Sequence, residues 1–157
     1  THIAIETAET GHLVFGTLHT TTAISTVDRL IDQFPAEQQQ QIRTMLSGAL
    51  KGVVAQNLLK KKGGGRVAAL EILVVNAAVA SLIREGKGSQ ILSIMQTAKK
   101  EGMTLLNQEL ARLVKQEIVE PEEAWKKAVD KGDFQKVLES IGYSYRPAGE
   151  EPAPRQQ

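Results

Sequence analysis

The sequence contains no cysteine, which excludes disulfide bonds and thiolate metal sites and fits a reducing compartment. It also lacks a long basic run: 19 Lys and Arg face 18 Asp and Glu, and the one short block is Lys60–Lys62. Nucleic-acid binding is therefore not the favoured function. No apolar run reaches the length of a bilayer span, so we expect no direct membrane span. The 157 residues suffice for one domain or two small ones, each with a real core.

The first third of the chain predicts helix, strand and two helices. Residues 3–10 have a helical pattern that Gly11 ends, because glycine adopts a left-handed conformation without strain. The run HLVFGTLH, residues 12–19, is short and almost continuously apolar, which is typical of a strand buried on both faces of a parallel sheet. A helix follows over 23–34, with Thr21 or Thr22 of the TTT run as its N-cap.

The middle of the chain predicts a long helix and then a hairpin. The helix starts near Ala36, and apolar residues from Ile42 to Val54 recur at helical spacing in one stripe. The segments VAQNLL and VAALEILVV favour two strands, and KKKGGGR between them is a glycine-rich turn.

After Val75 the pattern is helical throughout. Five residues are predicted at helix starts, as caps or in the first turn: Asn76, Ser89, Thr104, Pro121 and Asp133.

The predicted fold class is α/β. Residues 1–75 are expected to form an α/β part with a parallel strand, helices and a hairpin, and residues 76–146 a small all-helical subdomain. The tail 147–157 has no large apolar side chain, so we expect it to be disordered. One helix–strand–helix unit cannot build a covered parallel sheet, and the helical pattern is already under way at Thr1. We therefore expect a piece of a longer protein.

Two of the three histidines, His12 and His19, stand seven positions apart at the ends of the predicted strand. In a strand this spacing spans about 23 Å at roughly 3.3 Å per residue, and the odd interval directs the side chains to opposite faces. A shared metal ion or a hydrogen-bonded pair is then excluded, and no metal site is predicted. Ligands bind at the carboxyl ends of strands, so His19, before the hydroxyl-rich TTT run and a helix N-terminus, is the candidate ligand contact. The alternative is a purely structural histidine.

The string TAETGHLVFGTLHTTTAISTVDRLIDQFP closely resembles the histidine box and following helices of the PilT-type retraction ATPases of type IV pili, in the type II/type IV secretion ATPase superfamily. The resemblance continues through MLSGALKGVVAQNLLKKKGGGRVAALEILV, LIRE, SIMQTAKKEGM and LLNQEL. It implies the C-terminal part of a RecA-like ATPase core that forms a homo-hexamer, binds ATP and Mg²⁺, and powers pilus retraction and twitching motility. It also implies a cytoplasmic protein, peripheral at the inner-membrane platform of the pilus machine.

The same resemblance implies roles for individual residues. His19 is expected near the γ-phosphate as a sensor of nucleotide state, and Thr20 is expected to supply a hydroxyl near the same phosphates. His12 is the first histidine of the box, and we expect this residue to serve packing or subunit contacts. Gln56 matches a position near the nucleotide, with a polar residue at a strand end as the alternative.

The helix AVASLIRE, residues 78–85, resembles the AIRNLIRE motif that the family ties to retraction. Ala80 and Ser81 stand where the family has Arg and Asn. Four positions of the motif are retained: Leu82, Ile83, Arg84 and Glu85. The alternative is an ordinary amphipathic helix whose last two residues are solvated.

Other parts of an ATPase are missing from the sequence. It has no GxxxxGK[ST] motif to cradle the β-phosphate, since the lysines of KKGGG precede the glycines. The family's catalytic Glu is expected upstream of Thr1, so we expect no catalytic residue here and no activity of this piece alone. The lack of cysteine disfavours pilus-extension and type II secretion ATPases, which usually carry a zinc-binding tetracysteine module near LLKKKGGGRV. A non-enzymatic protein-interaction module is the remaining alternative.

Overall fold

The computed structural model describes residues 1–145 and 147. Apart from Pro147, the predicted disordered tail lies outside these residues. The chain separates into two compact units, the first made of Thr1–Asn57 and Leu70–Leu106, the second of Leu58–Ala69 and the residues from 107 onward. The predicted boundary between residues 75 and 76 falls inside the first unit and stays a prediction.

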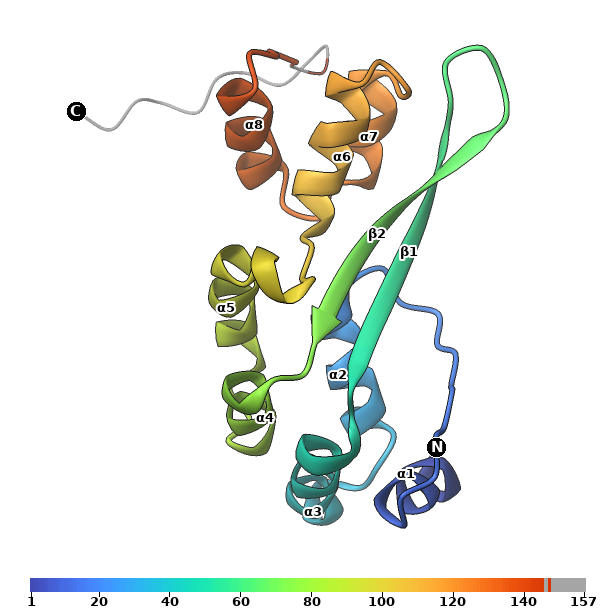
Figure 1. Ribbon diagram of the computed structural model, residues 1–157, viewed down its shortest axis with the longest axis vertical. Helices are drawn as coiled ribbons and strands as arrows, with labels where there is room; N and C mark the ends of the chain where they lie inside the picture. Colours follow the sequence, from blue (N-terminus) through green and yellow to red (C-terminus); the bar gives the residue numbers. More distant parts are fainter. Residues whose placement is uncertain (146, 148–157) are drawn as a thin grey trace, which may run out of the picture. The chain divides into compact units, whose positions relative to one another are not determined.

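Short helices and one hairpin make up both units (Figure 1). In chain order they are α1 (His2–Glu9), α2 (Ala23–Asp32), α3 (Ala36–Ala49), β1 (Gly52–Lys60), β2 (Arg66–Val74), α4 (Ala77–Arg84), α5 (Ile91–Thr97), α6 (Leu106–Lys115), α7 (Pro121–Lys127) and α8 (Lys131–Ser140). The 3₁₀ turns Gly88–Gln90 and Lys99–Glu101 flank α5. None of the helices in the described ranges has the length and apolar character that crossing a membrane demands.

The predicted hairpin is confirmed. Three consecutive glycines, Gly63–Gly65, all have positive φ in the turn, a backbone conformation that other residues rarely adopt. Strand β1 alternates strictly between buried and exposed residues, as expected for a strand with one face on the core. On β1 the buried positions are Val53, Ala55, Asn57 and Leu59, and the exposed ones between them are Val54, Gln56 and Leu58.

The predicted parallel strand over residues 12–19 is wrong. These residues run as an extended connection from α1 to α2 (Figure 1), and Leu13 and Phe15 are 82% and 89% exposed. Among the described residues the sheet consists of β1 and β2, so this segment has no neighbouring strand to satisfy its backbone groups. Apolar composition alone cannot supply those hydrogen bonds.

The long apolar stripe predicted for one helix is divided between two elements. Helix α3 ends at Ala49, where Leu50 turns to an extended conformation, and Val53 and Val54 belong to β1. Val53 is buried and Val54 is 64% exposed, which is strand alternation rather than a helical stripe. Two adjacent valines fit both periods, so the pattern did not locate the boundary.

Several predicted helix ends are confirmed. The Thr22 hydroxyl accepts a hydrogen bond from the Ser25 N–H at 3.2 Å and caps α2, and Asn76 Oδ1 accepts from the Val79 N–H at 3.0 Å and caps α4. Pro121 is the first residue of α7, and Gly11 has a φ of +94° just after α1.

Three other predicted helix starts are wrong. Ser89 lies inside a 3₁₀ turn and makes no capping bond to α5. Thr104 pairs with Ile72 of β2 through two backbone hydrogen bonds of 2.9 Å, so its backbone extends the sheet instead of opening a helix. Asp130, not Asp133, caps α8, and its carboxylate accepts from the Asp133 N–H at 2.8 Å.

Each unit has its own buried side chains. In the first, α3 packs against α1, α2 and α4. Its core includes Val27, Leu46, Leu73, Val79, Ile91 and Met95. In the second unit the fully buried side chains include Leu59, Leu110, Leu113, Phe134 and Leu138.

Candidate functional site

The candidate site lies where the extended connection enters α2. We call Thr20–Thr26, which holds four threonines and one serine, the threonine segment. Its hydroxyls bond one another: Thr20 Oγ1 and Thr26 Oγ1 lie 2.6 Å apart, and Thr26 Oγ1 also lies 2.8 Å from the Thr22 carbonyl oxygen. Thr22 and Ser25 form a reciprocal capping box that opens the helix. The local sequence therefore explains why the chain turns into a helix here.

Three polar side chains are buried at this segment, one within it and two that reach it from the hairpin strands. Thr26, Asn57 and Glu71 are 8%, 8% and 5% exposed, and in the described part of the chain they are the buried polar or charged residues. Asn57 Nδ2 donates to the Thr21 carbonyl at 3.0 Å, and Glu71 Oε1 accepts from the Ala23 N–H at 2.7 Å. All three therefore bond to the same short stretch of backbone or hydroxyls.

Glu71 was missed by the sequence analysis, although a signal was present. It is the one charged residue in the apolar run VAALEILVV, at a position that strand alternation buries. The sequence predicts that the N-terminus of α2 attracts an anion. The structure does place an anion there, but it is the carboxylate of Glu71 from the chain itself.

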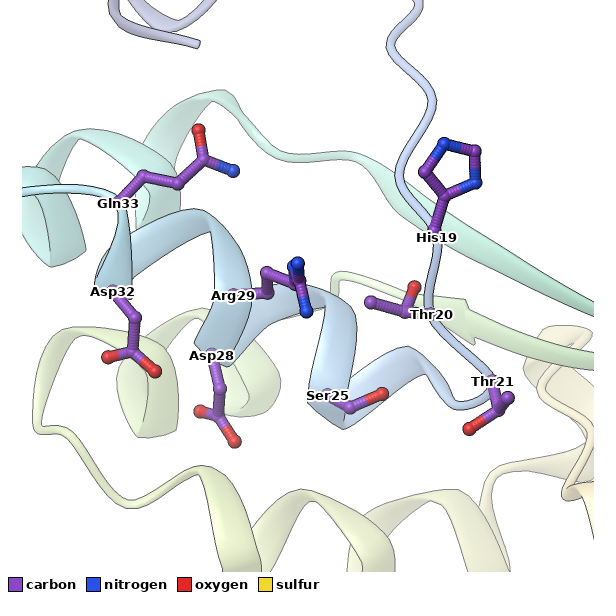
Figure 2. Close-up of a pocket in the computed structure, with 8 residues that line it drawn as sticks. All are labelled: His19, Thr20, Thr21, Ser25, Asp28, Arg29, Asp32 and Gln33. Carbon is purple, nitrogen blue, oxygen red and sulfur yellow. The ribbon is translucent and has the colours of Figure 1, made fainter.

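An open depression of about 620 Å³ lies beside the threonine segment and runs along α2 (Figure 2). At one end it is lined by His19, Thr20, Thr21 and Ser25, so imidazole and hydroxyl groups face the space. In Figure 2 the Arg29 side chain extends from α2 toward Thr20. Hydrogen-bond donors and a guanidinium suit the oxygen atoms of a phosphate.

The other end of the depression is acidic. Asp28 and Asp32 point to one side of α2, away from His19 (Figure 2). Burial raises the pKa of Asp28 above its ordinary value, the negative charge of Asp32 raises it further, and the Arg43 guanidinium lowers it in part. Two carboxylates repel phosphate, so only the His19 end of the depression fits a phosphate group.

The structure brings together some of the predicted site residues and separates others. His19 and Thr20 line the same depression. His12 lies at the far end of the extended connection, next to Gly11, where its Nδ1 is 3.1 Å from Thr10 Oγ1. Gln56 is exposed on the face of β1 opposite to Asn57 and does not line the depression.

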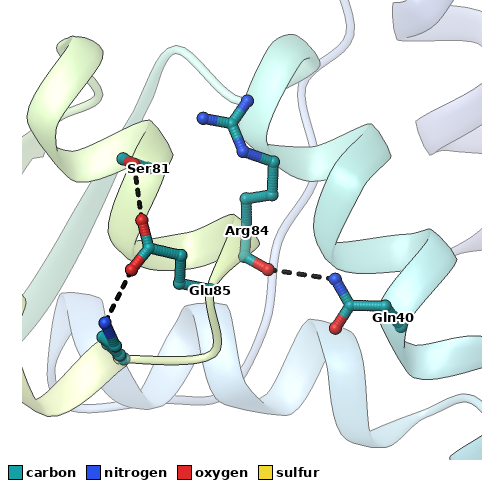
Figure 3. A network of polar contacts seen from close by, with 5 residues as sticks. Gln40, Ser81, Arg84 and Glu85 are labelled. Carbon is teal, nitrogen blue, oxygen red and sulfur yellow. Dashed lines mark hydrogen bonds and ion pairs between the residues drawn. The ribbon is translucent and has the colours of Figure 1, made fainter.

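The motif at residues 82–85 occupies the end of α4. Ile83 is 2% exposed and Leu82 is half-buried, whereas Arg84 and Glu85 are exposed. Figure 3 shows the polar contacts here: the Gln40 side chain of α3 donates to the Arg84 carbonyl at 3.1 Å. The motif therefore combines a buried apolar half with a solvent-facing charged half.

Glu85 is held by its neighbours. Lys87 and Ser81 both donate to its carboxylate at 2.8 Å, and these hydrogen bonds hold the pKa of Glu85 below its ordinary value. Ser81, one of the two departures from the family motif, therefore has a contact within the motif itself.

Within residues 1–145 and 147 no group of three or more His, Asp or Glu side chains is placed to hold a metal ion. The donors around His19 suit phosphate oxygens, but they do not supply the carboxylate cluster of an all-protein Mg²⁺ site.

Comparisons with known proteins cover most of this chain. Residues 1–126 match the family described as "Type II/IV secretion system protein". The chain is 53% identical over 127 residues to a twitching motility protein of Neisseria gonorrhoeae, covering 80% of this chain and 34% of that protein. It is 50% identical over 126 residues to the "Type IV pilus retractation ATPase PilT" of Pseudomonas aeruginosa, covering 80% and 37%.

A solved structure shows the same similarity. The crystal structure of the pilus retraction motor PilT with bound ADP matches with a TM-score of 0.76 and 47% identity, over 84% of this chain and 37% of that one. The chain thus spans about a third of the length of the relatives it matches.

Proposed function

The chain belongs to the Type II/IV secretion system protein family, and we propose that it forms part of a hexameric ATPase that powers type IV pilus retraction and twitching motility. The observation that carries this proposal is the donor-lined end of the depression at His19. The segment that resembles the family's histidine box forms this end of the depression. The chain is also 50% identical, over 126 residues, to the retraction ATPase of Pseudomonas aeruginosa.

In this proposal His19 and Thr20 contact the γ-phosphate of ATP through the imidazole and the hydroxyl. Loss of that phosphate on hydrolysis removes their partner, so the pair distinguishes ATP from ADP. Arg29 adds a positive charge near Thr20. His12 and Gln56 lie away from the depression, so we propose roles for them in packing or in contacts between subunits.

Mg²⁺ bound with the nucleotide neutralises phosphate charge. We propose that Mg²⁺ is held mainly by residues outside this chain, and that the P-loop and the catalytic Glu also lie outside it. The 157 residues by themselves are then expected to show no ATP turnover above background.

The exposed Arg84 and Glu85 are proposed to transmit the motor's output to the inner-membrane platform at the pilus base, with the protein in the cytoplasm. The buried Ile83 anchors the motif in the core of the first unit. The buried Ile83 thus fixes the end of α4, and the charged side chains of Arg84 and Glu85 remain exposed for contact with a partner.

A deletion strain separates retraction from extension. If the protein drives retraction, cells without it keep surface pili and lose twitching. If it drives extension or secretion, surface pili or secreted protein disappear instead, which would overturn the retraction assignment. Unchanged pili and twitching would favour the protein-interaction module.

A further inference from the structure

We propose that Glu71 is a positioning residue for the phosphate-contacting end of the site and acts through the threonine segment, with Asn57 and Thr26 supporting it. The inference rests on the proposed function, because it requires His19 and Thr20 to contact nucleotide phosphates. Glu71 does not line the depression, so the role proposed for it is indirect.

The buried polar side chains of the described residues converge on one short segment. Buried hydrogen bonds add little net stability, but they are directional. In the described part of the chain one of the three buried polar side chains, Thr26, belongs to the threonine segment, and the other two, Asn57 and Glu71, both bond to it. A core built for stability alone has no need to gather its polar groups at one place. Fixing the position of that segment is what this arrangement achieves.

Glu71 is held at both of its carboxylate oxygens. Its Oε1 accepts from the Ala23 N–H at 2.7 Å, and its Oε2 accepts from the Leu106 N–H at 3.1 Å. Both oxygens are engaged, so the carboxylate cannot rotate freely. Next to it, Ile72 is tied to Thr104 by the backbone bridge. The threonine segment is thus anchored to strand β2 rather than to a loop.

Two backbone N–H groups at the start of α2 already have acceptors. Its first amide is occupied by Glu71, and the Ser25 amide is occupied by the Thr22 hydroxyl. In the proposed function the side chains of His19 and Thr20 contact the phosphate. Those side chains sit just before α2, so a shift of the helix start displaces them directly.

The experiment uses the assembled ATPase and compares its affinities for ATP and ADP. Glu71→Gln keeps the size and shape of the side chain and one oxygen that can accept a hydrogen bond. The NH₂ group that replaces the other oxygen cannot accept a hydrogen bond, so one of the two backbone N–H groups loses its acceptor. We expect the ratio of ATP to ADP affinity to fall roughly tenfold, because small misplacements of a contact group have effects of this size. His19→Ala should lower the ratio similarly, and the double variant should lower it no further.

Met95→Ala is the control for lost stability. Met95 is buried in α5 and makes no hydrogen bond to the threonine segment, so this variant weakens the core while the affinity ratio stays at the wild-type value. A similar fall in Met95→Ala would overturn the inference.

The outcomes separate the two claims. If His19→Ala lowers the ratio and Glu71→Gln does not, or if their effects add, the inference fails and the proposed function stands. If His19→Ala leaves the ratio unchanged, both fail. Should Glu71→Gln not fold, Asn57→Ala removes the bond to Thr21 from the other strand. A wild-type ratio in that variant would overturn the inference.

Discussion

The carboxylate of Glu71 accepts a hydrogen bond from the backbone N–H of Ala23 at 2.7 Å, across 48 positions of sequence. Through this bond β2 holds the start of α2, and therefore the turn that carries Thr20 and Thr21. A carboxylate at a helix N-terminus is also favoured by the helix dipole. One side chain thus joins the hairpin to the candidate site.

Replacing Glu71 by Ala should lower the free energy of unfolding by about 2–6 kcal/mol. The substitution leaves two buried N–H groups, those of Ala23 and Leu106, without an acceptor, and each such group is worth about 1–3 kcal/mol. Urea unfolding of wild type and variant measures the change. Glu101→Ala is the matched control, since this exposed carboxylate bonds only the Asn76 side chain and its loss should change stability by less than about 0.5 kcal/mol.

Thr22→Ala should destabilise the protein by about 1 kcal/mol, because the Ser25 N–H loses its cap. Thr22→Ser keeps the hydroxyl and should stay within about 0.5 kcal/mol of wild type. The midpoint of urea unfolding distinguishes the two variants. Equal midpoints for both would show that the capping bond contributes nothing.

The raised pKa of Asp28 predicts a pH dependence. The folded state binds the Asp28 proton more tightly than the unfolded state does, so the free energy of unfolding falls as pH rises from the ordinary pKa of 3.8 through the raised value. Asp28→Asn carries no charge at any pH. It should be more stable than wild type above that window, and the difference should disappear below it.

Unfolding curves between about pH 3 and about pH 7 test the Asp28 prediction. In Asp32→Asn one of the causes of the shift is removed, so the fall in stability with pH should be smaller than in wild type. If the difference in stability between Asp28→Asn and wild type did not change with pH, the raised pKa of Asp28 would be contradicted.

Arg84→Ala should abolish or strongly reduce twitching while the protein remains folded and assembled. Arg84 is exposed, so its removal costs little packing, and a motility defect then reports on contacts with another protein. Twitching zones of cells carrying the variant provide the measurement. Arg112→Ala removes another exposed arginine, on α6, and cells carrying it should twitch normally. Equal twitching of cells with the two variants would contradict the role proposed for Arg84.

Local features of this fold were predictable from the sequence. The hairpin followed from alternation and three glycines, and the caps Thr22 and Asn76 followed from side chains that bond the backbone within a few residues. The helix end at Gly11 and the helix start at Pro121 could also be predicted, because the backbone preferences of glycine and proline act within one or two positions.

Features set by distant parts of the chain were not predictable. Whether residues 12–19 form a strand depends on a neighbouring strand, which apolar composition does not reveal. Thr104 looked like a helix start because its pairing with Ile72 is long-range. His19 and Thr20, which line the same depression, were predicted from the motif, and their contact with phosphate stays a prediction. Glu71 could not be predicted in this way, because its place depends on a contact 48 positions away.

The most direct test of the central claim is the steady-state rate of ATP hydrolysis by the assembled ATPase carrying His19→Ala, with His2→Ala as the matched control. His2 is also an exposed histidine, paired with Glu6 on α1, and does not line the depression. If His19 contacts the γ-phosphate, kcat for His19→Ala falls roughly tenfold or more, whereas His2→Ala hydrolyses ATP at the wild-type rate. Equal rates for His19→Ala and wild type would contradict the account.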